Sequence, residues 1–214
     1  MTNVIDVAKK CFQDEAQAIL NLIPKLDDNF TKAIELIIES KGKLILTGVG
    51  KSGHIGAKIA STMASTGTPA FFVNPLDAFH GDLGMIGKGD VVLAISNSGQ
   101  TDELLRFIPL LKERNIPIIS MSGNPASLLA KYSDCHLDIS VQREACPLNL
   151  APTSSTKVSV TLIKSYGLLT VQPSKPSSNP PFLRRFSSVP SATRLMSSIY
   201  QPSGISVESK FSFN

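Results

Sequence analysis

The chain has 214 residues, 42% of them hydrophobic and 18% charged, which is enough for one domain with a hydrophobic core and excludes a fully disordered chain. The net charge of +4 arises from residues 171–214, which hold five cations and one acid, whereas residues 1–170 hold 16 of each sign. A nucleic-acid-binding face on the folded part is therefore not expected. We expect no signal peptide and no membrane span, because the first twenty residues carry charges and no long apolar run follows. The expected location is therefore cytoplasmic.

Residues 1–40 carry apolar side chains at helical spacing in two stretches separated by Pro24 and the polar run 27–29, which predicts two amphipathic helices. From residue 43 on, short β-branched runs alternate with stretches of helical period. The runs are almost continuously apolar, as in parallel strands that helices cover on both faces. They predict a doubly wound α/β fold with strands at Lys43–Thr47, Ala70–Asn74, Val91–Ser96, Ile116–Ser120 and His136–Ser140.

The end of the chain has a different composition. Residues 157–170 can form one amphipathic helix, but residues 171–214 contain twelve Ser and six Pro with no sustained period. Such a segment buries too little apolar surface to offset its ordering entropy. We therefore expect one folded domain over residues 1–170 and a disordered, basic, Ser/Pro-rich tail over residues 171–214.

In a doubly wound sheet the ligand lies beyond the carboxyl ends of the strands, so the loops there are the first candidates for a site. The loop Gly48-Val49-Gly50-Lys51-Ser52-Gly53 has the glycine spacing of a dinucleotide-binding turn, with Asp77 at about the place of a ribose-binding acid. A nucleotide P-loop is excluded, because Ile45 stands where that motif needs glycine. The same glycines also fit a tight strand-to-helix turn. A dinucleotide-binding oxidoreductase therefore stays a weaker alternative.

The loop Ser96-Asn97-Ser98-Gly99-Gln100-Thr101 places three hydroxyl groups and an amide at the start of a predicted helix. Backbone N–H groups and the helix dipole favour an anion there, and each hydrogen bond to a charged group contributes about 1.5–3 kcal/mol. A serine N-cap alone explains one hydroxyl, but not three. The loop therefore predicts a site for a compact phosphate group.

Short motifs follow one another along the chain: residues 50–56 (GKSGHIG), 64–69 (ASTGTP), 80–85 (HGDLGM), 95–99 (ISNSG), 144–148 (EACPL) and 150–156 (LAPTSST). In this order they resemble the sugar isomerase (SIS) domain of bacterial arabinose-5-phosphate isomerases, over residues 1 to about 156. The resemblance implies a five-stranded parallel sheet flanked by helices, in a flavodoxin-like or Rossmann-like three-layer sandwich.

The activity that the resemblance implies is interconversion of D-ribulose 5-phosphate and D-arabinose 5-phosphate through an enediolate, for 3-deoxy-D-manno-octulosonate in lipopolysaccharide or capsule. It also implies a small-molecule sugar phosphate as partner, no organic cofactor, and a homo-oligomer, typically a tetramer with active sites at subunit interfaces. No metal is expected either, because no two histidines have metal-ligand spacing and the three cysteines lack the spacing of a zinc site.

Such a reaction needs a base for a carbon-bound proton, a group that moves protons between two oxygens, and a positive or hydrogen-bonding group beside the enediolate. By resemblance, the catalytic candidates are Lys51, His80, Glu103 and Glu144, and which carboxylate is the base stays open. The phosphate-binding candidates are Ser52, Ser96, Asn97, Ser98 and Thr101, and the other substrate-binding candidates are Gly50, Thr153, Ser154 and Ser155.

The chain departs from this family after about residue 156. There the family continues into a long apolar helix and a Ser-His-Pro-Gly-Gly segment, whose histidine is a further catalytic candidate, and paired CBS domains often follow; none of these is expected here. The abrupt change looks like a frameshifted or rearranged reading frame. The alternative function is therefore a noncatalytic sugar-phosphate-binding SIS module.

Overall fold

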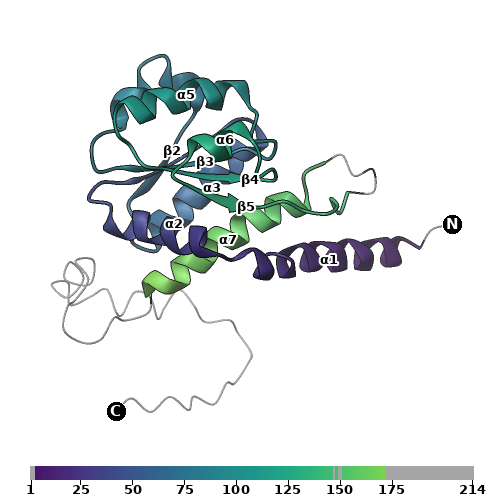
Figure 1. Ribbon diagram of the computed structural model, residues 1–214. Helices are drawn as coiled ribbons and strands as arrows, with labels where there is room; N and C mark the ends of the chain where they lie inside the picture. Colours follow the sequence, from purple (N-terminus) through teal and green to yellow (C-terminus); the bar gives the residue numbers. More distant parts are fainter. Residues whose placement is uncertain (1–2, 147, 149–150, 172–214) are drawn as a thin grey trace, which may run out of the picture. The chain divides into compact units, whose positions relative to one another are not determined.

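A five-stranded parallel sheet in the order β2-β1-β3-β4-β5 forms the centre of the fold (Figure 1). The computed structural model describes residues 3–146, 148 and 151–171, so the tail expected beyond residue 171 lies outside the described residues. This strand order is that of flavodoxin-like doubly wound sheets, which confirms the predicted fold class. The strands are β1 (Leu44–Gly48), β2 (Ala70–Val73), β3 (Val91–Ile95), β4 (Ile118–Ser122) and β5 (Cys135–Asp138).

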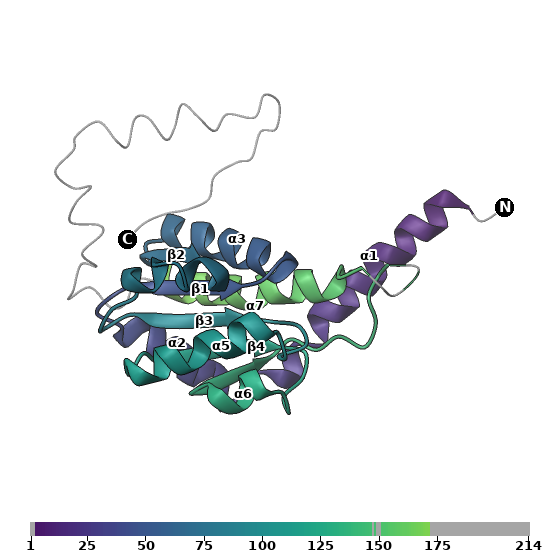
Figure 2. The same ribbon diagram turned by 90° about the horizontal axis from the view of Figure 1, so that it is seen from above.

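Helices cover both faces of the sheet, as the two views in Figures 1 and 2 show. One face packs against α2 (Asp28–Glu39), α3 (Lys51–Ser65) and α7 (Ser154–Val171). The other packs against α4 (Pro75–Ala78), α5 (Asp102–Glu113) and α6 (Leu128–Tyr132). Two short 3-10 helices, η1 (Ile23–Lys25) and η2 (Asp82–Met85), complete the described elements of the sandwich.

The two faces of the sheet form two hydrophobic clusters. Strand β3 illustrates the division, because Leu93 and Ile95 belong to the cluster under α3 and α7, whereas Val92 and Ala94 belong to the cluster under α5. Every residue of β3 is buried, as its continuous apolar run predicted. Full burial of a Leu, Ile or Val side chain contributes about 1.5–3 kcal/mol to the stability of the fold. The central strands therefore form a stable core that supports the loops at their carboxyl ends.

The strand boundaries differ from the sequence-based prediction by one or two residues. The largest correction is at β4, which was expected over Ile116–Ser120 and lies over Ile118–Ser122. Ile116 instead closes the end of α5, where its N–H bonds to the Leu111 carbonyl. The buried Ser120 and Ser122 can continue the strand because their hydroxyl groups have hydrogen-bond partners. Smaller shifts move β5 from His136–Ser140 to Cys135–Asp138 and β1 from Lys43–Thr47 to Leu44–Gly48; β2 and β3 end one residue early.

The N-terminal region forms the two predicted helices, but α1 (Val4–Leu20) contributes no buried residue. It contacts α7, and the end of α1 that begins at Val4 extends past the sandwich (Figures 1 and 2). Helix α2, by contrast, buries Ala33 and Ile37 against the sheet. The predicted C-terminal helix is also present, and it begins at Ser154 rather than at Lys157.

Candidate functional site

The turn between β1 and α3 places Lys51 at the start of a helix. Gly50 has a φ of +57°, a backbone conformation that suits glycine. A Cβ atom at Gly48 would lie 2.9 Å from the Ile95 carbonyl oxygen, and one at Gly53 would lie 2.7 Å from the Gly48 carbonyl oxygen. Close packing of the helix on two strands therefore accounts for the glycine spacing without a dinucleotide.

The loop between β3 and α5 brings its three hydroxyl groups together. Ser96 is only 3% exposed, and its Oγ lies 2.7 Å from Thr101 Oγ1 and 3.4 Å from Ser98 Oγ. Thr101 occupies the N-cap position of α5, but its hydroxyl makes no capping hydrogen bond to that helix. Gly99, at φ +63°, donates its N–H to Ser96 Oγ at 3.0 Å. The predicted cluster of small donors thus exists at the start of α5.

Glu144 lies in the segment after β5 and is held by the start of α7. Its Oε2 accepts hydrogen bonds from the Thr153 N–H at 2.7 Å, the Thr153 hydroxyl at 3.2 Å and the Ser155 N–H at 3.2 Å. Burial raises the pKa of Glu144, but the hydrogen bonds from Ser155 and Thr153 outweigh it, so the pKa lies below its usual value. Glu144 is therefore ionised at neutral pH.

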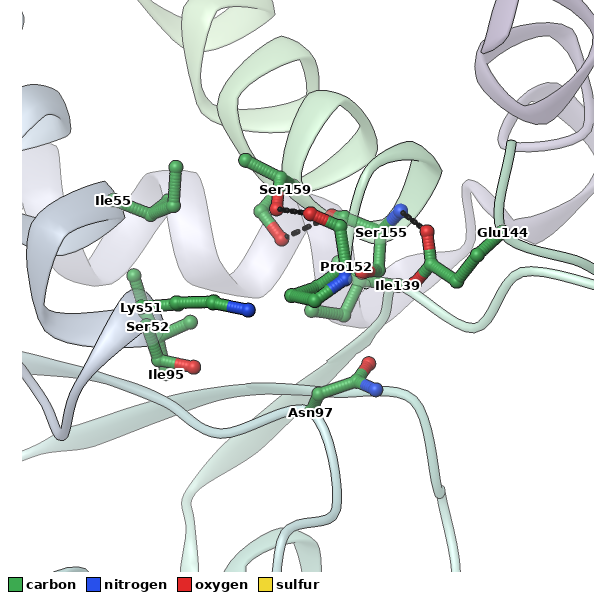
Figure 3. A pocket seen from close by; sticks show the side chains of 11 residues that line it. Lys51, Ser52, Ile55, Ile95, Asn97, Ile139, Glu144, Pro152, Ser155 and Ser159 are labelled. Atoms are coloured by element: carbon green, nitrogen blue, oxygen red, sulfur yellow. Dashed lines mark hydrogen bonds between the residues drawn. The ribbon is translucent and has the colours of Figure 1, made fainter. Parts of the chain in front are cut away.

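A pocket of about 290 Å³ opens at this end of the sheet (Figure 3). It brings together five residues that the sequence singled out: Lys51 and Ser52 from α3, Asn97 from the loop after β3, Glu144, and Ser155 from α7. In Figure 3 the Lys51 side chain points into this space from α3, while Glu144 lies on the side of α7. A cation and a carboxylate thus line the same small pocket.

Six further residues line the pocket and were not predicted: Ile55, Ile95, Ile139, Pro152, Thr156 and Ser159. Helical periodicity could have predicted two of them as lining residues. Ile55 follows Lys51 by four residues and Ser159 follows Ser155 by four, and residues at this spacing share one face of a helix. Ile95 and Ile139 could not be predicted, because an apolar residue at the end of a strand has the same sequence pattern whether it packs in the core or lines a pocket.

The remaining predicted residues lie outside the described lining of the pocket. Ser96 and Ser98 flank the lining residue Asn97 in the chain, and the Thr101 hydroxyl contacts Ser96. Gly50 directly precedes the lining residue Lys51. Glu103 lies half-buried in the first turn of α5, and His80 is exposed beyond the end of α4. Within the described part of this single chain, neither Glu103 nor His80 joins Lys51 and Glu144.

Thr153 and Ser154 interact with the chain itself. The Ser154 side chain is fully buried and its Oγ accepts the Ala145 N–H at 3.0 Å, while the Thr153 hydroxyl accepts the Cys146 N–H at 3.2 Å. These contacts tie the segment 144–146 to the start of α7.

No group of three or more His, Cys, Asp or Glu among the described residues could hold a metal ion. No helix in the described ranges is both long and apolar enough to cross a membrane. His136 lines a different pocket, together with Lys25 and Asp138; its Nδ1 lies 2.9 Å from Ser120 Oγ, and burial lowers its pKa.

Comparison with known proteins places this geometry in a family. The SIS domain model matches residues 36–168. Arabinose 5-phosphate isomerase KdsD of Pseudomonas aeruginosa is 54% identical over 158 residues, which are 74% of this chain and 48% of the relative. The protein of the same name from Francisella tularensis is 52% identical over 165 residues, or 76% of this chain and 50% of the relative. The chain therefore spans about half the length of the curated relatives it matches.

A solved structure of an Escherichia coli protein in complex with arabinose 5-phosphate is also similar. It superimposes with a TM-score of 0.75 at 40% sequence identity, covering 79% of this chain and 92% of that one. The fold, the motifs around the pocket and these relatives agree with the resemblance found in the sequence. The chain belongs to the SIS domain family.

Proposed function

We propose that this chain is an aldose–ketose isomerase that interconverts D-ribulose 5-phosphate and D-arabinose 5-phosphate, supplying 3-deoxy-D-manno-octulosonate biosynthesis. The observation that carries the proposal is the pocket in which Lys51 and Glu144 lie together beside the hydroxyl loop. The names of the relatives and the arabinose 5-phosphate bound to the similar structure support the choice of substrate.

The reaction moves hydrogen within one molecule. From arabinose 5-phosphate, a base takes the proton from C2 and the electron pair forms the enediolate. A proton then returns to C1, and the proton of the C2 hydroxyl passes to O1, so that C2 becomes the carbonyl. The hydroxyl cluster of Ser96, Ser98 and Thr101 would hold the phosphate. Lys51 would stabilise the negative charge of the enediolate, a step in which a fixed positive charge is most effective.

We assign the removal of the C2 proton to Glu144 rather than to Glu103. Glu144 lines the pocket beside Lys51 and is ionised, as a general base must be, although the hydrogen bonds that lower its pKa also reduce its basicity. Glu103 lies in the first turn of α5, where a carboxylate also complements the helix dipole. His80 stays a candidate for moving a proton between oxygens, from an exposed position that a second copy of the chain could approach.

We also propose that the active form is a homo-oligomer, as the resemblance implies. The supporting observation is an apolar stripe on α1 formed by Ile5, Phe12, Ala16 and Leu20, which share one face of the helix. Ile5, Phe12 and Leu20 are 62%, 70% and 54% exposed. An exposed apolar stripe of this kind is typical of an interaction surface.

The test is conversion by the purified chain. D-ribulose 5-phosphate is supplied and D-arabinose 5-phosphate is measured, alongside Glu144→Gln and Ser98→Ala. We expect Glu144→Gln to lower kcat by at least about 100-fold through loss of the base, and Ser98→Ala mainly to raise KM through loss of a phosphate donor.

Calorimetry with the same sugar phosphates separates the outcomes. Binding without conversion would identify the noncatalytic binding module instead of an isomerase. A natively folded chain that neither binds nor converts pentose phosphates would rule out both functions.

A further inference from the structure

The carboxylate of Glu144 is held by a residue that follows it by nine positions. Thr153 donates both its backbone N–H, at 2.7 Å, and its hydroxyl, at 3.2 Å, to Oε2 of Glu144. The next contact, from the Ser155 N–H at 3.2 Å, comes from the first turn of α7. Three donor groups of Thr153 and Ser155, two residues apart at the start of α7, therefore converge on one oxygen atom.

This arrangement differs from ordinary helix capping. Thr153 is the N-cap residue of α7, because it directly precedes Ser154 and its carbonyl accepts the Lys157 N–H at 3.2 Å. An N-cap threonine normally turns its hydroxyl to an amide of its own helix. Here that hydroxyl contacts Glu144 and the Cys146 N–H instead, and Glu144 accepts the amide of Ser155. The Glu144 carboxylate thus accepts the helix amide that the N-cap hydroxyl would usually accept, and the Thr153 hydroxyl contacts the segment around Glu144 instead.

We propose that Thr153 is a positioning residue for Glu144, which fixes the carboxylate at the edge of the pocket in the orientation that proton transfer requires. The inference rests on the proposed function and deepens it, because it gives Thr153 a role other than contact with substrate. Ser154 has a companion role, since its buried Oγ holds the Ala145 N–H at 3.0 Å and so fixes the backbone beside Glu144.

The electrostatics agree with this role. Hydrogen bonds from Ser155 and Thr153 overcome the effect of burial and lower the pKa of Glu144. Charged groups near it include Lys51, which lines the same pocket, and Arg143 and Lys157, which adjoin it in the segment and in the first turn of α7. Replacing the Thr153 hydroxyl leaves these charges in place, so a change in titration after that replacement reports the lost hydrogen bond.

The experiment compares Thr153→Val, which removes the hydroxyl at nearly constant volume, with Thr153→Ser, which restores it. We expect Thr153→Val to lower kcat by about 10- to 100-fold, because misplaced catalytic groups lose rate steeply, with KM changed less than about twofold. We also expect the acidic limb of the kcat–pH profile to move to higher pH. Thr153→Ser should recover both properties.

The matched control is Thr62→Val, which removes a hydroxyl that bonds to the Lys58 carbonyl on the exposed side of α3. It should leave kcat, KM and the pH profile unchanged, and thermal unfolding checks that each variant is folded. A raised KM with unchanged kcat in Thr153→Val would instead make Thr153 a substrate-binding residue and overturn the proposal. So would a folded Thr153→Val variant that behaves like the control.

A second measurement keeps this inference separate from the proposed reaction. The titration of the Glu144 side chain, followed by NMR on carbon-labelled glutamate, needs no activity. Lack of isomerase activity in the unsubstituted chain would remove the proposed function only. An upward shift of the Glu144 midpoint in Thr153→Val would still support the positioning role, and an unchanged midpoint would refute it.

Discussion

Gly99 shows how a single residue determines the shape of the hydroxyl loop. Its φ of +63° is unfavourable for other residues, and a Cβ there would overlap Ser127 Oγ. Ser127 in turn caps α6 by accepting the Ala130 N–H at 3.2 Å. The loop that gathers the hydroxyl groups is therefore packed directly against the start of another helix.

We predict that Gly99→Ala destabilises the protein by about 1–3 kcal/mol, from backbone strain together with overpacking. Urea unfolding monitored by circular dichroism measures the change. Gly87→Ala is the control, since a Cβ at Gly87 meets nothing within 4 Å and its φ is not positive. Equal stability of the two variants would show that the loop adapts and that the glycine is not required.

At the scale of elements, an ion pair joins η1 to the end of β5. Lys25 Nζ lies 3.2 Å from Asp138 Oδ2 and donates to the Ser140 carbonyl at 2.7 Å. Burial raises the pKa of Asp138, but hydrogen bonds from Ser140 and Lys25 and the charge of Lys25 lower it below its usual value. The connection between α1 and α2 is thereby attached to the edge strand of the sheet.

We predict that Lys25→Met lowers the free energy of unfolding by about 1–2 kcal/mol at neutral pH, because the Ser140 carbonyl and Asp138 both lose a partner. Since the folded-state pKa of Asp138 is lowered, its stabilising effect is complete above the usual value of 3.8 and is lost as the pH falls through the lower folded value. The difference between Lys25→Met and the parent should therefore shrink below about pH 3.8.

Chemical unfolding at several pH values tests this prediction. Lys10→Met serves as the control, because Lys10 pairs with Asp14 at 2.8 Å within α1 and 62% of its side chain is exposed. Exposed pairs of this kind contribute only about 0.3–0.5 kcal/mol. A loss in Lys25→Met no larger than that of the control, or one that does not depend on pH, would contradict the role of the Lys25 contacts.

At the scale of the whole molecule, the exposed stripe on α1 predicts self-association. We expect the parent chain to sediment as an oligomer and Phe12→Glu to shift it toward the monomer, because a charge would be buried in an apolar contact. Sedimentation velocity over a range of concentrations measures this. Gln13→Glu, on the next residue around the helix, should leave the oligomer intact. A monomeric parent chain would contradict the proposed assembly.

The elements of the fold could be predicted from the sequence because each carries a local signal. The apolar runs at 44–48 and 91–95 show burial on both faces, and the helical periods between them show the covering layers. The end of β4 could not be predicted beyond Ser120, because Ser122 reads as a turn residue until the partner of its buried hydroxyl, the Asn124 carbonyl, is known.

For the site, the sequence by itself determined that polar and glycine-rich loops with Lys51 and the hydroxyl cluster follow the strands, and the family resemblance added Glu144 as a candidate. Only the tertiary structure decided which of them share a pocket, bringing Lys51 to Glu144 while leaving Glu103 outside the described lining. It also showed that Thr153 contacts Glu144. The physical reason is that local patterns specify helices and strands, whereas the side-chain partners across the carboxyl edge of a sheet depend on how distant segments pack.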